Sequence, residues 1–128
     1  TPEKIAPLAV YLGSDRAASM NRFRDLLSRG MELGAGSDSP LTTIDPLVGV
    51  AAFEAHHDPS QRLRREEAVR VFTLGSAGLA HQEDKKGSLE PGKHADFAVY
   101  DVDLIGSPSL DGVRPVLTVS LGRDVYAA

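Results

Sequence analysis

The stretch "GAGSDSP", residues 34–40, decides how this sequence is interpreted. It places one carboxylate, Asp38, after a run of small residues and before a proline, with a serine on each side. The short apolar segment 31–36 predicts a buried strand, although periodicity alone does not separate such a strand from a buried helix. Enzymes with parallel sheets carry their functional groups where strands end. Asp38 is therefore either such a group or the side chain of an Asx-turn bonded to nearby amides.

Outward from this stretch, the sequence predicts helices before residue 81 and strands after residue 86. Helical spacing of apolar residues and helix-start signals indicate four helices, at residues 1–12 (with Thr1 as N-cap), 17–29, 45–57 and 66–80. The later part predicts a short strand from residue 87, a Pro-Gly turn at 91–92, a strand at 95–101 and a hairpin turning at 121–123. We expect an α/β protein of two parts, residues 1–84 and 85–128.

Composition excludes several classes of function. A net charge of −4 argues against nucleic acid or an anionic membrane as the main partner, because both require a basic face. The sequence has no cysteine, which excludes disulfides, thiolate metal ligands and cysteine nucleophiles and fits a cytoplasmic protein. No apolar run approaches the roughly 18 residues that span a bilayer, and no signal-peptide pattern is present. Because the first residue is threonine, the chain is consistent with a processed or excised piece.

The other side chains with catalytic potential lack a recognisable pattern. The histidines show no HxH, HxxxH or HExxH spacing, and His56 and His57 would point about 100° apart on a helix. We expect all four histidines, at positions 56, 57, 81 and 94, at the surface or in loops. Ser37 and Ser39 have no positioned base beside them in sequence. The arginines of "DRAASMNRFR" and "QRLRREE" are interleaved with acidic residues and predict solvated helix faces.

Four stretches together resemble one family. They are "LLSRGMELGAGSDSPLTTIDPLVGV" (26–50), "REEAVRVFTLGSAGLA" (65–80), "GSLEPGKHADFAVYD" (87–101) and "VLTVSLGRDVYAA" (116–128). In this order and spacing they are similar to the C-terminal part of amidohydrolase-superfamily enzymes, in particular the amidohydrolase-3 (YtcJ-like) group. The resemblance implies the last strand of a (β/α)8 barrel with its flanking helices in residues 1–84. It implies strands of a small β-sandwich in residues 85–128.

The resemblance also implies a role for Asp38, which matches the family's catalytic aspartate after the eighth barrel strand. Asp38 would bind or face a divalent metal, Zn²⁺ or similar, and take a proton from the metal-activated water. It would then return that proton to the leaving nitrogen of a small amide-type substrate. Thr42 or Thr43 would lie near that substrate, which the resemblance leaves unidentified.

The sequence departs from the family pattern because the other metal ligands have no counterparts, and a barrel needs about 250 residues. We therefore expect the C-terminal portion of a longer enzyme, whose partner is the missing N-terminal part of the same protein. Alone, this piece should hold no metal, be inactive and self-associate through exposed apolar surface. Arg64 replaces the usual Ser or Thr cap, which should weaken that helix start by about 1 kcal/mol. The alternatives are a non-catalytic structural or interaction module and a non-hydrolytic enzyme of the same fold.

Overall fold

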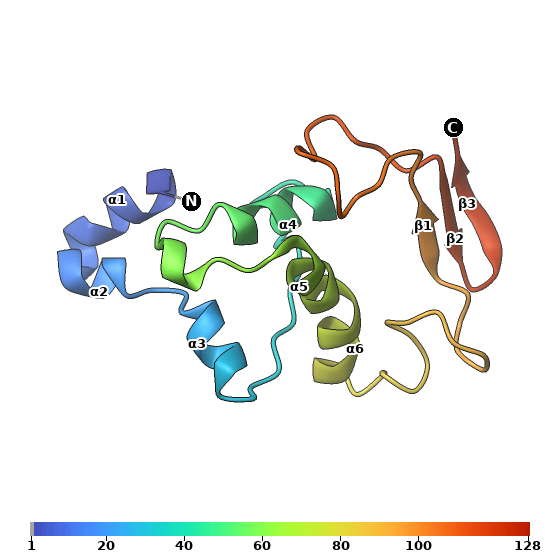
Figure 1. Cartoon of the computed structure of the whole chain (residues 1–128), viewed down its shortest axis with the longest axis horizontal. Helices are drawn as coiled ribbons and strands as arrows, with labels where there is room; N and C mark the ends of the chain where they lie inside the picture. The colour runs from blue at the N-terminus through green and yellow to red at the C-terminus, as the bar shows by residue number, and fades with distance from the viewer. Residues whose placement is uncertain (1) are drawn as a thin grey trace.

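The computed structural model describes residues 2–128, with side chains described from residue 7 onward. Its elements are α1 (Pro2–Leu12), α2 (Ser14–Ala18), α3 (Phe23–Ser28), α4 (Pro46–Glu54), the 3-10 turn η1 (Pro59–Gln61), α5 (Arg65–Arg70), the π-turn η2 (Val71–Gly75), α6 (Ser76–Leu79), β1 (Phe97–Val99), β2 (Leu117–Ser120) and β3 (Arg123–Ala127). The helices occupy one end of the molecule and the strands the other, as Figure 1 shows. None of the described helices has the length and apolar character needed to cross a membrane.

The first two predicted helices have different outcomes. A helix runs from Pro2 to Leu12 as predicted and ends at Gly13, whose φ of 80° only glycine adopts easily. The proposed Thr1 cap lies outside the described residues. The single helix predicted at 17–29 is wrong, because the chain forms two short helices, α2 and α3, with residues 19–22 between them. Asn21 has a φ of 59°, and a residue in this conformation cannot continue a right-handed helix.

The helical run from residue 65 to 79 agrees with the prediction and contains one irregularity. Its middle turn, η2, is a π-turn, a form that occurs mostly as single turns within α-helices. At the start of α5, the side chain of Glu67 accepts a hydrogen bond from the Arg64 backbone N–H at 2.7 Å. This is the carboxylate half of a capping box, so the helix start is stabilised although Arg64 replaces a capping hydroxyl.

The core lies where α4 packs against α5. Its buried members are Leu47, Val50, Ala68 and Leu110, with half-buried Phe53, Val69, Phe72, Tyr100, Leu104 and Val113 packed against them. The last of the buried members, Leu110, belongs to the loop between β1 and β2, so this loop shares the core of the helices. The division at residue 84 predicted from sequence stays a prediction.

The sheet is antiparallel, with the strand order β1-β2-β3. Phe97 pairs with Val119, and Ser120 pairs with Arg123 across the predicted hairpin. Leu121 and Gly122 have φ values of 51° and 74°, which is the combination that a two-residue type I′ turn requires. The strand predicted from residue 87 is wrong, since this segment forms turns and irregular backbone. Among the described residues there is this single sheet, and a second layer of a sandwich stays a prediction.

The strand predicted at 31–36 is not formed within the described residues. The segment has no regular secondary structure and no neighbouring strand. A strand is defined by hydrogen bonds to a neighbour, and apolar sequence alone cannot supply that neighbour. The segment instead lies against α6, where the side chain of Ser76 bonds to the backbone of Ala35.

Candidate functional site

Asp38 lies at the start of a turn that follows the segment 31–36. Its φ is 57°, which is unusual for a residue other than glycine. The Asp38 carbonyl accepts hydrogen bonds from the N–H groups of Leu41 at 2.9 Å and Thr42 at 3.4 Å. The Thr42 hydroxyl donates to the carbonyl of Ser37. Backbone and hydroxyl groups therefore close this turn, and the carboxylate is not needed to form it.

The carboxylate of Asp38 is exposed and accepts no hydrogen bond from any residue in the range 2–128. An Asx-turn would have it bonded to a nearby amide. That function falls to Ser37, whose Oγ accepts the N–H of Ser39 at 3.3 Å. The structural alternative considered from the sequence, Asp38 as an Asx-turn residue, is therefore wrong.

Asp38 borders a shallow depression of about 460 Å³ between its turn and α4. Thr42 and Thr43 border the same depression, which is also lined by residues of α4 with small side chains, such as Ala51 and Ala52. Asp45 closes one end, and its Oδ1 accepts the Leu47 N–H at 3.0 Å, which makes it the N-cap of α4. The depression thus presents one unpaired carboxylate beside two hydroxyls on a mostly apolar floor.

The second oxygen of Asp45 connects this loop to the strand region. Its Oδ2 lies 3.0 Å from Nη1 of Arg114, in the segment that leads into β2. The Asp45 side chain is therefore used twice, for the helix cap and for the ion pair. Of the two aspartates at the depression, Asp38 is the one left free among the described residues.

The residues of the depression do not form a complete metal site. No group of three or more His, Cys, Asp or Glu side chains comes together anywhere in residues 2–128. A carboxylate oxygen is a suitable ligand for a divalent cation, but a catalytic zinc typically has three protein ligands. Asp38 can therefore contribute one ligand, and the described residues alone do not fit a bound metal.

None of the four histidines lines the depression beside Asp38, and His56 and His57 lie next to each other with ring centroids 4.2 Å apart. His56 lies in the loop between α4 and η1, which agrees with the expectation of surface or loop histidines, but its side chain is only 4% exposed. α4 ends at Glu54, and the His56 ring then turns inward to pack edge-on against Phe23, with ring centroids 5.5 Å apart. His57 donates from Nε2 to the carbonyl of Ala18 at 3.0 Å. These contacts are those of packing residues.

The arginine clusters are also less solvated than predicted. Arg65 has a side chain only 13% exposed, and its Nε bonds to the carboxylate of Glu54 while Nη1 donates to the carbonyls of Leu104 and Ser107. This arginine ties α4 and α5 to the loop that follows β1. The prediction of solvated faces is wrong for Arg65 because its charge is matched by Glu54 and by backbone carbonyls.

The second arginine pair joins α3 to α5. Arg24 donates from Nη1 and Nη2 to the two oxygens of Glu67, at 2.6 and 2.7 Å. The hydrogen bonds from Arg24 are the main cause that lowers the pKa of Glu67 to about 2. The acidic groups paired in this way serve the fold.

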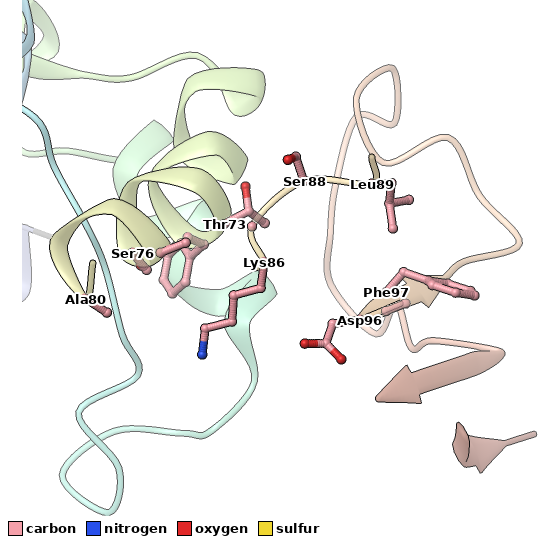
Figure 2. A pocket seen from close by; sticks show the side chains of 12 residues that line it. Thr73, Ser76, Ala80, Lys86, Ser88, Leu89, Asp96 and Phe97 are labelled. Carbon is pink, nitrogen blue, oxygen red and sulfur yellow. The ribbon is translucent and has the colours of Figure 1, made fainter. Parts of the chain in front are cut away.

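A second depression of similar size lies between the helical run and the start of β1. Figure 2 shows Thr73, Ser76 and Ala80 on the helical side and Asp96 and Phe97 on the strand side. The sequence analysis did not single out Ser76. Its partner, Ala35, is 41 positions away in the sequence, so no local pattern could have indicated the contact.

The comparisons with known proteins place the chain in a family. The family model described as "Amidohydrolase family" matches residues 4–126, and the chain belongs to this family. It is 32% identical over 127 residues to a putative amidohydrolase, YtcJ, of Bacillus subtilis, a match covering 90% of this chain and 24% of that protein.

Two solved structures are similar in fold. An amidohydrolase from Thermotoga maritima matches with a TM-score of 0.63 at 21% identity, over 83% of this chain and 26% of that one. An uncharacterized metal-dependent hydrolase from Pyrococcus furiosus matches with a TM-score of 0.57 at 38% identity, over 65% of this chain and 18% of that one. The chain therefore spans about a quarter or less of the length of the proteins it matches.

Proposed function

We propose that this chain is the C-terminal part of a metal-dependent hydrolase that cleaves carbon–nitrogen, amide-type bonds of a small molecule. Asp38 is the catalytic and metal-facing residue that this part contributes. The missing N-terminal part of the same protein would supply the remaining ligands and most of the substrate pocket. Membership of the amidohydrolase family supports the reaction class, and the short coverage of the relatives supports a longer parent protein.

One observation carries the proposal: the Asp38 carboxylate is free. Other acidic side chains of the helical part, Glu54, Glu67 and Asp45, are engaged by arginines or a helix N-terminus. Asp38 instead stands exposed at the edge of a depression, in a backbone conformation with φ of 57°. Unusual backbone conformations of this kind are concentrated at functional sites. Asp15 and Glu66 are also exposed and make no side-chain ion pair with the described residues, but they do not line the depression, so it is the combination of a free carboxylate and this position that supports a chemical role for Asp38.

The chemistry of Asp38 follows from its acid–base properties. In the full-length protein, Asp38 would hold one position of a divalent metal, which would supply an activated water as the source of the proton and would polarise the scissile carbonyl. Asp38 takes up a proton at a carboxylate oxygen and later delivers it to the departing nitrogen, so that the amine leaves as a neutral group. Thr42 and Thr43 lie where their hydroxyls could orient the substrate.

The test uses the full-length protein that contains this chain, loaded with Zn²⁺ and assayed for amine release from a panel of small, open-chain N-substituted amides. Asp38→Asn keeps the shape of the side chain and removes its basicity. We expect kcat to fall by about a factor of 10²–10⁴, the usual contribution of a general acid–base group. Asp84→Asn is the matched control, since Asp84 is exposed on the loop after α6.

Each outcome of this assay separates the alternatives. Retention of wild-type kcat by Asp38→Asn would refute the role of this residue. If the wild-type protein releases no amine from any panel compound and binds no Zn²⁺ in dialysis, the non-catalytic module becomes the better description. Turnover without amine release would indicate a non-hydrolytic reaction on the same fold.

A further inference from the structure

Ser76 makes an unusual pair of hydrogen bonds with one residue of the segment that precedes Asp38. The Ala35 N–H donates to Ser76 Oγ at 3.0 Å, and Ser76 Oγ lies 2.7 Å from the carbonyl oxygen of Ala35. A serine hydroxyl has one donor and two acceptor positions, so it can serve both groups at once. The side chain thus satisfies the same two backbone groups that a neighbouring strand would pair with.

This contact is the main anchor of the segment. Within the part of the chain that the structure describes, residues 32–36 make no other hydrogen bond. The backbone of the helical run comes very close to this segment at Gly75. A Cβ built on Gly75 would lie only 1.9 Å from the carbonyl oxygen of Leu33. Gly34 is confined less tightly, with the Cα of Ser76 3.1 Å from a Cβ built there. Small residues on both sides therefore allow the hydroxyl to reach Ala35.

The contact between Ser76 and Ala35 lies directly after the π-turn of the helical run. η2 ends at Gly75, and Ser76 Oγ also lies 3.0 Å from the carbonyl oxygen of Val71, the first residue of that turn. One hydroxyl hydrogen can serve only one of the two carbonyls at a time, so Val71 and Ala35 share it. π-turns occur frequently at functional sites, and here the turn lies beside the segment that leads to Asp38.

We propose that Ser76 is a positioning residue, which sets the location of the Asp38 carboxylate by fixing the backbone of Ala35. Asp38 is three positions after Ala35, a distance of at most about 10 Å along the chain. A shift of Ala35 is therefore passed on to the turn that carries the carboxylate. The catalytic consequence rests on the proposed function of Asp38, whereas the structural consequence does not.

The test compares Ser76→Ala with Thr73→Val in the full-length protein. Both substitutions remove one hydroxyl from the same helical run, but Thr73 Oγ1 donates within its own helix, to the Val69 carbonyl at 2.9 Å. Figure 2 shows the two side chains on the same side of the second depression. The measurements are hydrogen–deuterium exchange of the segments 31–36 and 37–41 by mass spectrometry, thermal unfolding, and kcat and KM for the panel amide that the wild type hydrolyses.

For Ser76→Ala we expect exchange at 31–36 and 37–41 to become about fivefold to tenfold faster, the size of one lost hydrogen bond. We expect kcat to fall by about tenfold to 100-fold through misplacement of Asp38, with KM little changed. Thr73→Val should match the wild type in both measurements. A merely structural serine would change the unfolding temperature without this separation of kcat from KM.

Three results would overturn the inference: unchanged exchange at 37–41 in Ser76→Ala, wild-type kcat in Ser76→Ala when Asp38→Asn is impaired, or an equal loss of kcat in Thr73→Val. The exchange result is independent of catalysis. If Asp38→Asn is fully active, the proposed function fails, while the exchange at 37–41 still decides whether Ser76 positions this turn.

Discussion

Acidic side chains are paired at the contact between α4 and α5, whereas the acidic side chain in the turn at Asp38 is not. At the α4–α5 contact, Glu54 is bonded to Arg65, and Glu67 is bonded to Arg24 and to the Arg64 N–H. In the turn, the Asp38 carboxylate accepts no hydrogen bond from the described residues, and backbone groups and hydroxyls close the turn.

This difference shows which carboxylates serve the fold. The hydrogen bonds from Arg24 lower the pKa of Glu67, so this paired carboxylate contributes to stability. A carboxylate outside such pairs contributes little to stability, and it stays available to bind a cation or move a proton. The following predictions test whether stability and the candidate chemistry are separated in this way.

The largest effect is expected in the core. Leu47→Ala removes a side chain that is 6% exposed and belongs to the buried cluster between α4 and α5. The free energy of unfolding should fall by about 3 kcal/mol, because the lost transfer free energy and the cavity add together. A urea titration followed by circular dichroism measures it. Val48→Ala is the control, since Val48 is the next residue of α4 and is 53% exposed. It should change stability by less than about 0.5 kcal/mol.

The next prediction concerns the close approach of the segment 31–36 to the helical run at Gly75. Gly75→Ala would place a Cβ against the Leu33 carbonyl oxygen, so the segment or the helix must move. We expect a loss of about 1–3 kcal/mol, the usual cost of overpacking. Gly36→Ala, where a Cβ meets nothing within 4 Å, should leave stability nearly unchanged. Equal stabilities of the two variants in thermal unfolding would show that the close approach is absent in solution.

A smaller effect is expected at the start of α4. Asp45→Ala removes the side-chain acceptor of the Leu47 N–H and should lower the free energy of unfolding by about 1 kcal/mol. Asp45→Asn keeps an acceptor oxygen and loses the ion pair with Arg114, whose side chain is 67% exposed. Because exposed ion pairs contribute little, the asparagine variant should stay close to the wild type. A loss of stability in Asp45→Asn as large as in Asp45→Ala would assign the effect to the ion pair instead of the cap.

The smallest effect is a pH dependence of the free energy of unfolding, which should involve Glu67 and not its neighbour Glu66. The pKa of Glu67 is lowered in the folded protein to about 2 by the Arg24 hydrogen bonds, below the unfolded value near 4.5. The folded state therefore binds fewer protons in this range, and the contribution of Glu67 to stability is present above pH 4.5 and is lost as the pH falls toward 2. For a partly exposed pair we expect at most about 1 kcal/mol.

Glu67→Gln should remove this contribution to the pH dependence of the free energy of unfolding, measured by urea titrations from pH 6 to pH 2. Glu66→Gln, on the exposed side of α5, should retain it. If both variants show the slope of the wild type, the ion pair between α3 and α5 does not contribute in solution.

The sequence predicted some elements well and others poorly, for identifiable reasons. The helix at 2–12, the helical run at 65–79 and the hairpin at 121–122 carry local signals, namely apolar periodicity, a glycine stop and a Leu-Gly turn. The strand at 31–36 and the single helix at 17–29 were wrong, because one needs a hydrogen-bonded neighbour and the other is broken at Asn21. Asp38 was found through the small residues before it and through the family resemblance.

By itself, the sequence determined the family, the order of helices before strands, and Asp38 as the candidate carboxylate, since these depend on residue type and short spacing. Only the tertiary structure decided that Asp38 is left free, that Glu54 and Glu67 are paired, and that Ser76 anchors Ala35. Those contacts join residues 11 to 43 positions apart. Their formation depends on how α3, α4, α5 and α6 pack, which no local pattern encodes.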